Sequence, residues 1–340
     1  NNIGPRVSFT YDVEGDGRTI VRGGAGRSFD RVASYFSYFE RRDASWRQYQ
    51  FTFNTTTNLA TLDPNVLRQR VAAGTIAGGA PAMNLLPDKL SAPVIDQFSV
   101  GVARQFSGEW GASMDFVYQS MSNIYTSRNL NYVNSAVAPA RRVLSPKYGD
   151  IQVWSDSAEA NNLLLMTSVN YKTEDYNLSG SYTFNAAKSW YDGNPAQNRP
   201  TNSPFTLFRS NGEEKHRFVI SGLAKLPFGF RFSTLFTLAS PRPFDVIDGR
   251  DLNKNGITGD DFPNGERNVL PDFSKIRNWY KMLDVRLSYT IGMSQFEMAG
   301  PSMEIMLDAF NLGNWVNFST FNGRKFDNNG NVLTTFGAGT

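Results

Sequence analysis

The sequence has no cysteine, and it has no apolar run long enough to form a membrane helix. Without disulfides, a chain of 340 residues must be held together by a packed core or by a ladder of strand hydrogen bonds. Without about 18–20 consecutive apolar residues, a helical membrane protein is excluded. A membrane β-barrel remains open, because barrel strands alternate apolar and polar residues and so average to a polar composition.

The sequence also lacks a large excess of positive or negative charge. The chain has 34 Lys and Arg against 31 Asp and Glu, a net charge of +3, and no basic run with interleaved aromatics, so we predict no nucleic-acid partner. The only histidine, His216, has no second histidine or cysteine to share a metal or catalytic site. No nucleophile elbow and no distinctive pair of acids is present, and we therefore predict that the chain is not an enzyme.

What the sequence does contain is strand periodicity. Within 110–118, the apolar residues Trp110, Met114 and Phe116 alternate with small or polar residues, a period of two rather than 3.6. Five segments with this pattern each enclose a short turn rich in Gly, Ser, Thr, Pro or acidic residues. We predict hairpins at 6–29, 95–120, 161–187, 215–240 and 282–310, with turns at 15–17, 107–109, 173–175, 227–229 and 299–300.

The connections between these hairpins are long, about 65, 40, 27 and 41 residues, so short and long connections alternate strictly. In an antiparallel meander this arrangement puts every short turn at one end and every long loop at the other. An outer-membrane barrel has that asymmetry, with short periplasmic turns, long extracellular loops, an apolar outside and a polar interior. The predicted fold class is therefore all-β, an antiparallel transmembrane outer-membrane β-barrel.

The segment 302–318 illustrates the prediction. Its apolar row from Met303 to Ala309 is expected to face lipid, while Glu304 and Asp308 face a wet lumen. A soluble β-sandwich or propeller is the alternative. It would explain the period of two but not the alternation of connection lengths.

Three stretches resemble one known family. They are NNIGPRVSFTYDVEGDGRTIVRGGAGRSFDR (1–31), IDQFSVGVARQFSGEWGASMDFVYQSMSNIYTSRNLN (95–131) and LDVRLSYTIG…MEIMLDAFNLGNWVNF (283–318). They are similar to barrel hairpins of the Oar-like TonB-dependent outer-membrane receptors. That family implies a plug domain inside a barrel of about 22 strands. On this resemblance, 1–340 is expected to be the C-terminal portion of the barrel, with about ten strands, and the plug and N-terminal barrel strands are not in this sequence.

The resemblance also implies a function. Such a receptor lies in the outer membrane of a Gram-negative bacterium, contacts outer-membrane lipid, and imports a ligand that its extracellular loops bind. The TonB energy-coupling system would act through the plug. The imported ligand stays unidentified at this point. Two alternatives remain: a structural or adhesive outer-membrane barrel without transport, and a passive porin.

Two groups of candidate site residues lie in the predicted extracellular loops. Aromatic rings there can grip a ligand, although Trp and Tyr also form girdles at membrane interfaces. The segment 251–261 resembles the first half of a calcium loop, with oxygen ligands at alternate positions before Gly256, but its twelfth position is Phe262 and lacks the closing carboxylate. A solvated turn without metal is the alternative there. The candidate ligand contacts are Trp154, Trp190, Tyr191, Trp279 and Tyr280, and the possible Ca2+ ligands are Asp251, Asn253, Asn255, Asp260 and Asp261.

Overall fold

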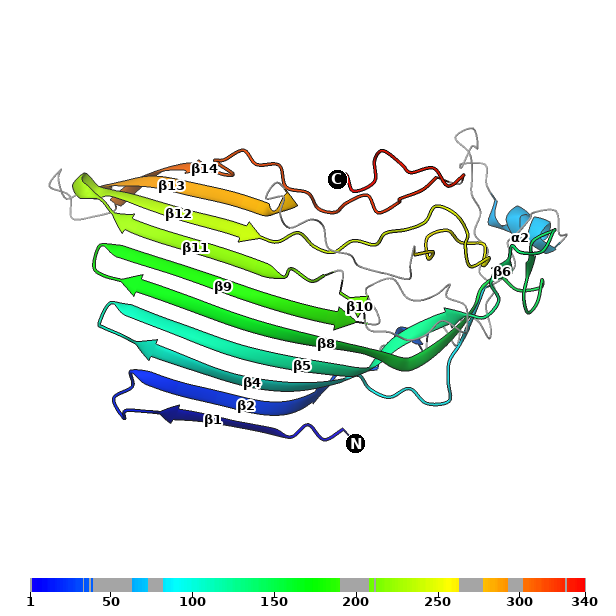
Figure 1. Cartoon of the computed structure of the whole chain (residues 1–340), viewed down its shortest axis with the longest axis horizontal. Helices are drawn as coiled ribbons and strands as arrows, with labels where there is room; N and C mark the ends of the chain where they lie inside the picture. Colours follow the sequence, from blue (N-terminus) through cyan, green and yellow to red (C-terminus); the bar gives the residue numbers. More distant parts are fainter. Residues whose placement is uncertain are drawn as a thin grey trace.

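The computed structural model describes residues 2–32, 34–36, 38, 63–72, 82–189, 208–210, 212–262, 278–292, 302–327 and 329–339. Its main element is one sheet in which ten strands follow each other as an antiparallel meander (Figure 1). In spatial order these strands are β1 (Arg6–Asp12), β2 (Thr19–Phe29), β4 (Val94–Gln105), β5 (Trp110–Asn129), β8 (Ile151–Lys172), β9 (Tyr176–Ser189), β11 (His216–Lys225), β12 (Phe230–Ala239), β13 (Tyr280–Gly292) and β14 (Ser302–Ala309).

Shorter elements lie on the loop side of the sheet. The strand β3 (Met83–Leu85) pairs in parallel with β8, and β10 (Phe208–Arg209) pairs with β9. A small separate hairpin joins β6 (Val133–Asn134) and β7 (Arg141–Arg142), the helix α2 covers Pro64–Ala72, and the 3-10 helix η2 covers Pro227–Gly229. Among the described residues, no helix has the length and apolar character to cross a membrane.

All five predicted hairpins are confirmed. The four described turns between β1 and β2, β4 and β5, β8 and β9, and β11 and β12 lie together at one end of the sheet, on the left in Figure 1. The described parts of the long connections lie at the opposite end. The fifth turn, predicted at 299–300, falls outside the described residues. The strict alternation of short and long connections in the sequence therefore corresponds to a sheet with two unlike ends.

The two faces of the sheet also differ as predicted. Phe232 on β12, Leu287 on β13 and Leu307 on β14 are direct partners in neighbouring strands and so share one face. Leu307 is 70% exposed, because no protein layer covers this face. On the other face, Arg286 donates from Nε and Nη2 to the Asp308 carboxylate at 2.5 and 3.1 Å. An apolar face without a protein partner and an opposite face with ion pairs fit lipid outside and water inside.

The second and third hairpins are longer than predicted. We expected their outer ends at residues 120 and 161, whereas β5 continues to Asn129 and β8 begins at Ile151. The two extensions pair with each other, with register irregularities between Met121 and Thr126 and a positive φ of 58° at Asn123. The hydrogen-bond ladder continues where the apolar alternation has faded. Beyond the lipid layer nothing selects for one apolar face, so the period-two signal disappears before the strand does.

At the loop end, the connection after β12 meets the chain that follows β14. Ile247 forms a parallel bridge with Arg324, and antiparallel bridges join Phe321 to Gly339 and Phe326 to Val332. The segment 310–339 therefore returns across the outer end of the sheet, which Figure 1 shows as the red trace beside β12 and its connection.

Candidate ligand-binding site

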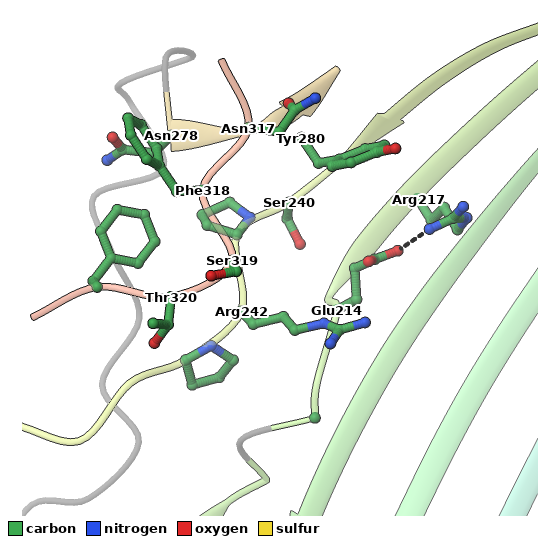
Figure 2. A pocket seen from close by; sticks show the side chains of 14 residues that line it. Glu214, Arg217, Ser240, Arg242, Asn278, Tyr280, Asn317, Phe318, Ser319 and Thr320 are labelled. Carbon is green, nitrogen blue, oxygen red and sulfur yellow. Dashed lines mark hydrogen bonds and ion pairs between the residues drawn. The ribbon is translucent and has the colours of Figure 1, made fainter. Parts of the chain in front are cut away.

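A hollow of about 740 Å³ opens where the outer ends of β11, β12 and β13 meet the segment after β14. Figure 2 shows side chains from all of these segments directed around the same space. Its lining residues are Gly212, Glu214, Arg217, Ser240, Pro241, Arg242, Pro243, Asn278, Tyr280, Asn317, Phe318, Ser319, Thr320 and Phe321.

Hydrogen bonds fix the walls of this hollow. The main-chain N–H of Ser240 donates to the carbonyl of His216 at 2.7 Å, and the Ser240 hydroxyl accepts from the His216 N–H at 3.0 Å. Across the hollow, the Asn317 side chain accepts from the Lys281 N–H and donates to the Lys281 carbonyl, both at 2.8 Å. An amide side chain thus replaces a strand partner for β13. These contacts hold the segment after β14 against the sheet.

Arg242 differs from the other charged residues of this hollow in its contacts. It makes no ion pair or hydrogen bond with any residue in the described part of the chain. The nearby Arg217, in contrast, donates to Glu214 at 2.8 Å (Figure 2). A guanidinium without a partner among the described residues can direct its forked N–H donors to a carboxylate or phosphate group. Hydroxyl and amide groups around it can take further polar contacts from a ligand.

One of the five predicted aromatic residues, Tyr280, lines this hollow, and Trp279 directly precedes it in the chain. The Tyr280 hydroxyl contacts Met282 Sδ at 3.2 Å. The neighbouring Trp279 stacks on the ring of His216, with 6.3 Å between ring centroids and an angle of 14° between ring planes. Trp190 and Tyr191 fall outside the described residues. The proposed role of these rings in ligand contact stays a prediction.

Trp154 lies elsewhere and has a structural environment. Its indole Nε1 donates to Asn84 Oδ1 at 2.9 Å, and its ring meets Phe36 edge-on at 5.1 Å between centroids. Phe36 is 3% exposed and also contacts Tyr125 edge-on at 4.9 Å. Trp154 therefore joins the loop after β2 and the strand β3 to the extended part of β8. It borders a second hollow of about 410 Å³, whose lining shares no residue with the first.

The calcium-like segment forms a closed loop beside this outer end. Lys254 and Gly256 have φ values of 60° and 82°, and the chain reverses between them. The carboxylate of Asp251 accepts the main-chain N–H groups of Asn255 and Gly256, each at 3.0 Å. The hydroxyl of Ser135, from another loop, also donates to this carboxylate. Both carboxylate oxygens of Asp251 thus accept hydrogen bonds, from its own loop and from Ser135.

The two other acids of the loop are withdrawn from solvent. Asp261 is 4% exposed and Asp260 is half-buried, and the neighbouring Asn255 is 1% exposed. Burial raises the pKa of Asp260 to about 6, although a hydrogen bond from Asn255 acts in the opposite direction, and burial also raises the pKa of Asp261. In the described part of the chain, no group of three or more His, Cys, Asp or Glu side chains is arranged to hold a metal ion. Any cation here would therefore need amide and main-chain oxygens as well.

Some residues of the hollow were not predicted as site residues. Arg242, Asn317 and Phe318 are brought together by a long connection and by the segment after β14. A signal for Arg242 was present in its sequence context, Pro241-Arg242-Pro243, because two prolines directly after a strand fix the backbone around one charge. The stretch that contains Asn317 shows strand alternation and a family resemblance, and neither indicates a binding site.

Comparison with known proteins assigns the chain to a family. A sequence model of the outer membrane beta barrel domain matches residues 1–296. The chain belongs to this family. As an outer membrane beta-barrel domain, it lies in the outer membrane of a Gram-negative bacterium, with the Phe232–Leu307 row towards lipid and the Arg286–Asp308 pair towards the barrel interior. No curated protein matches the sequence.

Several solved structures share the outer membrane beta-barrel architecture. The outer membrane transporter YddB from Escherichia coli is 12% identical with a TM-score of 0.61, and the match covers 94% of this chain and 38% of that one. The ferric enterobactin receptor PfeA from Pseudomonas aeruginosa is 11% identical with a TM-score of 0.53, covering 99% and 38%. The siderophore receptor PirA from Acinetobacter baumannii is 10% identical with a TM-score of 0.50, covering 92% and 37%. The chain thus spans less than two fifths of the length of these proteins, and the similarity establishes the barrel fold.

Proposed function

We propose that this chain is part of the barrel of a TonB-dependent outer-membrane receptor, which binds a ligand at its loop end and imports it through the barrel interior. In this proposal TonB acts on a plug domain encoded outside these 340 residues. The observation that carries the proposal is the hollow at the loop end, where Arg242 has no partner among the described residues. A structural barrel gains nothing from a guanidinium that no described residue pairs, whereas a receptor gains a ligand contact.

The chemistry of the hollow supports a ligand class. Arg242 favours a carboxylate, phosphate or similar anionic group, and Tyr280 and Phe318 offer flat apolar surface beside it. Ser319, Thr320 and Asn278 add neutral polar groups to the lining. We therefore propose a ligand that carries at least one anionic group on a partly apolar or cyclic framework.

The receptor proposal can be tested without knowing the ligand. The full-length protein, purified from outer membranes, would be measured for binding to the periplasmic domain of TonB and for ion conductance in a planar bilayer. The expected result is saturable TonB binding and no steady conductance, because a plug closes the barrel. Steady open conductance would instead indicate a porin. A closed barrel that does not bind TonB would indicate a structural or adhesive role.

A further inference from the structure

Two buried carboxylate oxygens in the 251–261 loop lack hydrogen-bond partners. They are Oδ2 of Asp261, a residue that is 4% exposed, and Oδ1 of Asp260. A buried acceptor without a partner loses its contact with water and gains nothing in return, which costs about 1–3 kcal/mol and more for a charged group. Native structures therefore rarely contain buried carboxylate oxygens without a partner, unless a water molecule or ion that binds them is missing.

The second oxygen of each carboxylate accepts a hydrogen bond from the turn formed by 251–256. The other oxygen of Asp261, Oδ1, accepts the main-chain N–H of Asn253 at 3.0 Å. The other oxygen of Asp260, Oδ2, accepts from Asn255 Nδ2 at 2.6 Å. Each carboxylate is thus held against this turn. The unpartnered oxygens thus belong to carboxylates that are anchored to this turn.

No positive side chain among the described residues forms an ion pair with these acids. Asp251, Asp260 and Asp261 form no ion pair with a Lys or Arg anywhere in the described ranges. Arg250, directly before the loop, binds Asp248 instead, with two bonds of 2.8 Å between guanidinium and carboxylate. Three acids close in sequence around one turn, with no Lys or Arg paired to them in the described part of the chain, favour a cation from solution.

We propose that this loop binds a calcium ion, with Asp261 and Asp260 supplying the carboxylate oxygens and the 251–255 turn supplying the others. The donors are all oxygens, and no His or Cys joins them, which favours a hard cation over zinc or copper. Calcium accepts carbonyl and amide oxygens in irregular arrangements, whereas magnesium requires near-octahedral geometry. In this site the adjacent acids at 260 and 261 take the place of the missing carboxylate at position 262.

The site would join three segments of the outer end. Ser135, in the connection between β5 and β8, bonds to Asp251, and its N–H donates to the Lys254 carbonyl at 3.1 Å. The carbonyl of Asp261 accepts the N–H of Asp248 at 2.7 Å. The neighbouring residue Ile247 forms two main-chain hydrogen bonds with the chain after β14. Its N–H donates to the Gly323 carbonyl at 2.8 Å, and its carbonyl accepts the Lys325 N–H at 2.9 Å. A bound ion would therefore stabilise the connection 130–150, the loop 241–262 and the segment after β14 together.

The test is calcium titration of the full-length protein in detergent, after chelator treatment and dialysis, by isothermal titration calorimetry with CaCl2. The expected result is one saturable site whose affinity falls at least 10-fold in Asp261→Asn. Asp327→Asn is the matched control, because Asp327 also opens an Asn- and Gly-rich turn but uses both oxygens within it. Its calcium affinity is expected to equal that of the unmodified protein.

Hydrogen–deuterium exchange gives an independent readout on the same samples. Calcium is expected to slow amide exchange in 130–150, 245–262 and 321–333, and MgCl2 at the same concentration is expected to have a much smaller effect. A second variant, Asp260→Asn, is included in case Asp261→Asn fails to form the barrel, and it is expected to weaken binding as well. Absence of calcium binding by the unmodified protein, or undiminished binding by both acid variants, would overturn the proposal.

Discussion

Arg22 on β2 reaches across β4 to bind Asp115 on β5. The guanidinium donates from Nε and Nη2 to the two carboxylate oxygens at 2.9 and 2.6 Å. Both residues are register partners of Gly101, which lies between them. A Cβ atom on Gly101 would lie 2.0 Å from Asp115 Oδ1, so only glycine leaves room for this bidentate pair. The three residues form one row on the interior face of the barrel.

This row gives the first prediction. Gly101→Ala should displace the Asp115 carboxylate and uncouple it from Arg22. A double-mutant cycle with Arg22→Ala and Asp115→Ala should give a coupling energy of about 0.2–1 kcal/mol in the unmodified background and near zero in the Gly101→Ala background. The measurement is the free energy of unfolding in lipid. Gly108→Ala is the control, because a Cβ there meets nothing within 4 Å, and an unchanged coupling energy in Gly101→Ala would contradict this account.

The second prediction concerns the two faces of β11. Ile220 lies on the lipid face at the middle of the strand, and the next residue, Ser221, lies on the interior face. Ile220→Arg should destabilise the folded barrel by about 2–4 kcal/mol, because the charge enters the hydrocarbon. Ser221→Arg should cost far less, since its side chain enters the wet interior. Guanidinium titration of both variants in lipid vesicles measures the difference in unfolding free energy. Equal destabilisation by the two substitutions would show that the face assigned here to lipid is the wrong one.

The third prediction separates packing from ligand contact at Trp154. Trp154→Ala should lose the edge-on contact with Phe36 and destabilise the loop after β2 by about 3 kcal/mol. Trp154→Phe should keep the ring contact, lose the bond to Asn84, and cost about 1 kcal/mol. Hydrogen exchange in 82–94 reports both effects. Unchanged exchange in Trp154→Ala would mean that the ring serves a ligand rather than the fold.

The fourth prediction concerns Arg242. Growth of a receptor-deletion strain of the source bacterium would first be compared with growth of its parent on iron chelates, peptides and glycans. Uptake of the nutrient that the deletion strain fails to use would then be measured. Arg242→Ala should raise the KM of uptake by roughly 10- to 100-fold, because a charge-assisted contact is lost, and leave the maximal rate unchanged. Arg18→Ala, at the turn between β1 and β2, is the control. Equal KM values in the two variants would remove Arg242 from the ligand site.

The hairpins were predictable because lipid imposes a simple rule on each strand. Every second residue from Trp110 to Tyr118 must suit hydrocarbon, so the strand is visible in the sequence without knowledge of its neighbours. The order of the hairpins then makes β12, β13 and β14 neighbours, and the structure adds the register that pairs Phe232, Leu287 and Leu307.

The outer end follows no such rule. Arg242 and Asn317 meet in one hollow only because the segment after β14 returns across the sheet, and no local pattern encodes that return. Trp154 was noticed as an exposed loop aromatic, but its partners Phe36 and Asn84 come from a distant connection. The acids at 251–261 were recognisable from spacing, whereas the burial of Asp261 required the structure.

The most direct test of the central claim is the intact mass of the denatured protein extracted from the outer membranes of its source bacterium. A plugged receptor built like YddB, of which this 38.0 kDa chain spans 38%, should have a mass of roughly 90–120 kDa. That result would support a barrel of about 22 strands with a plug for TonB to act on. A mass near 38.0 kDa would contradict the account, because a barrel of this chain alone has no plug and does not support TonB-dependent import.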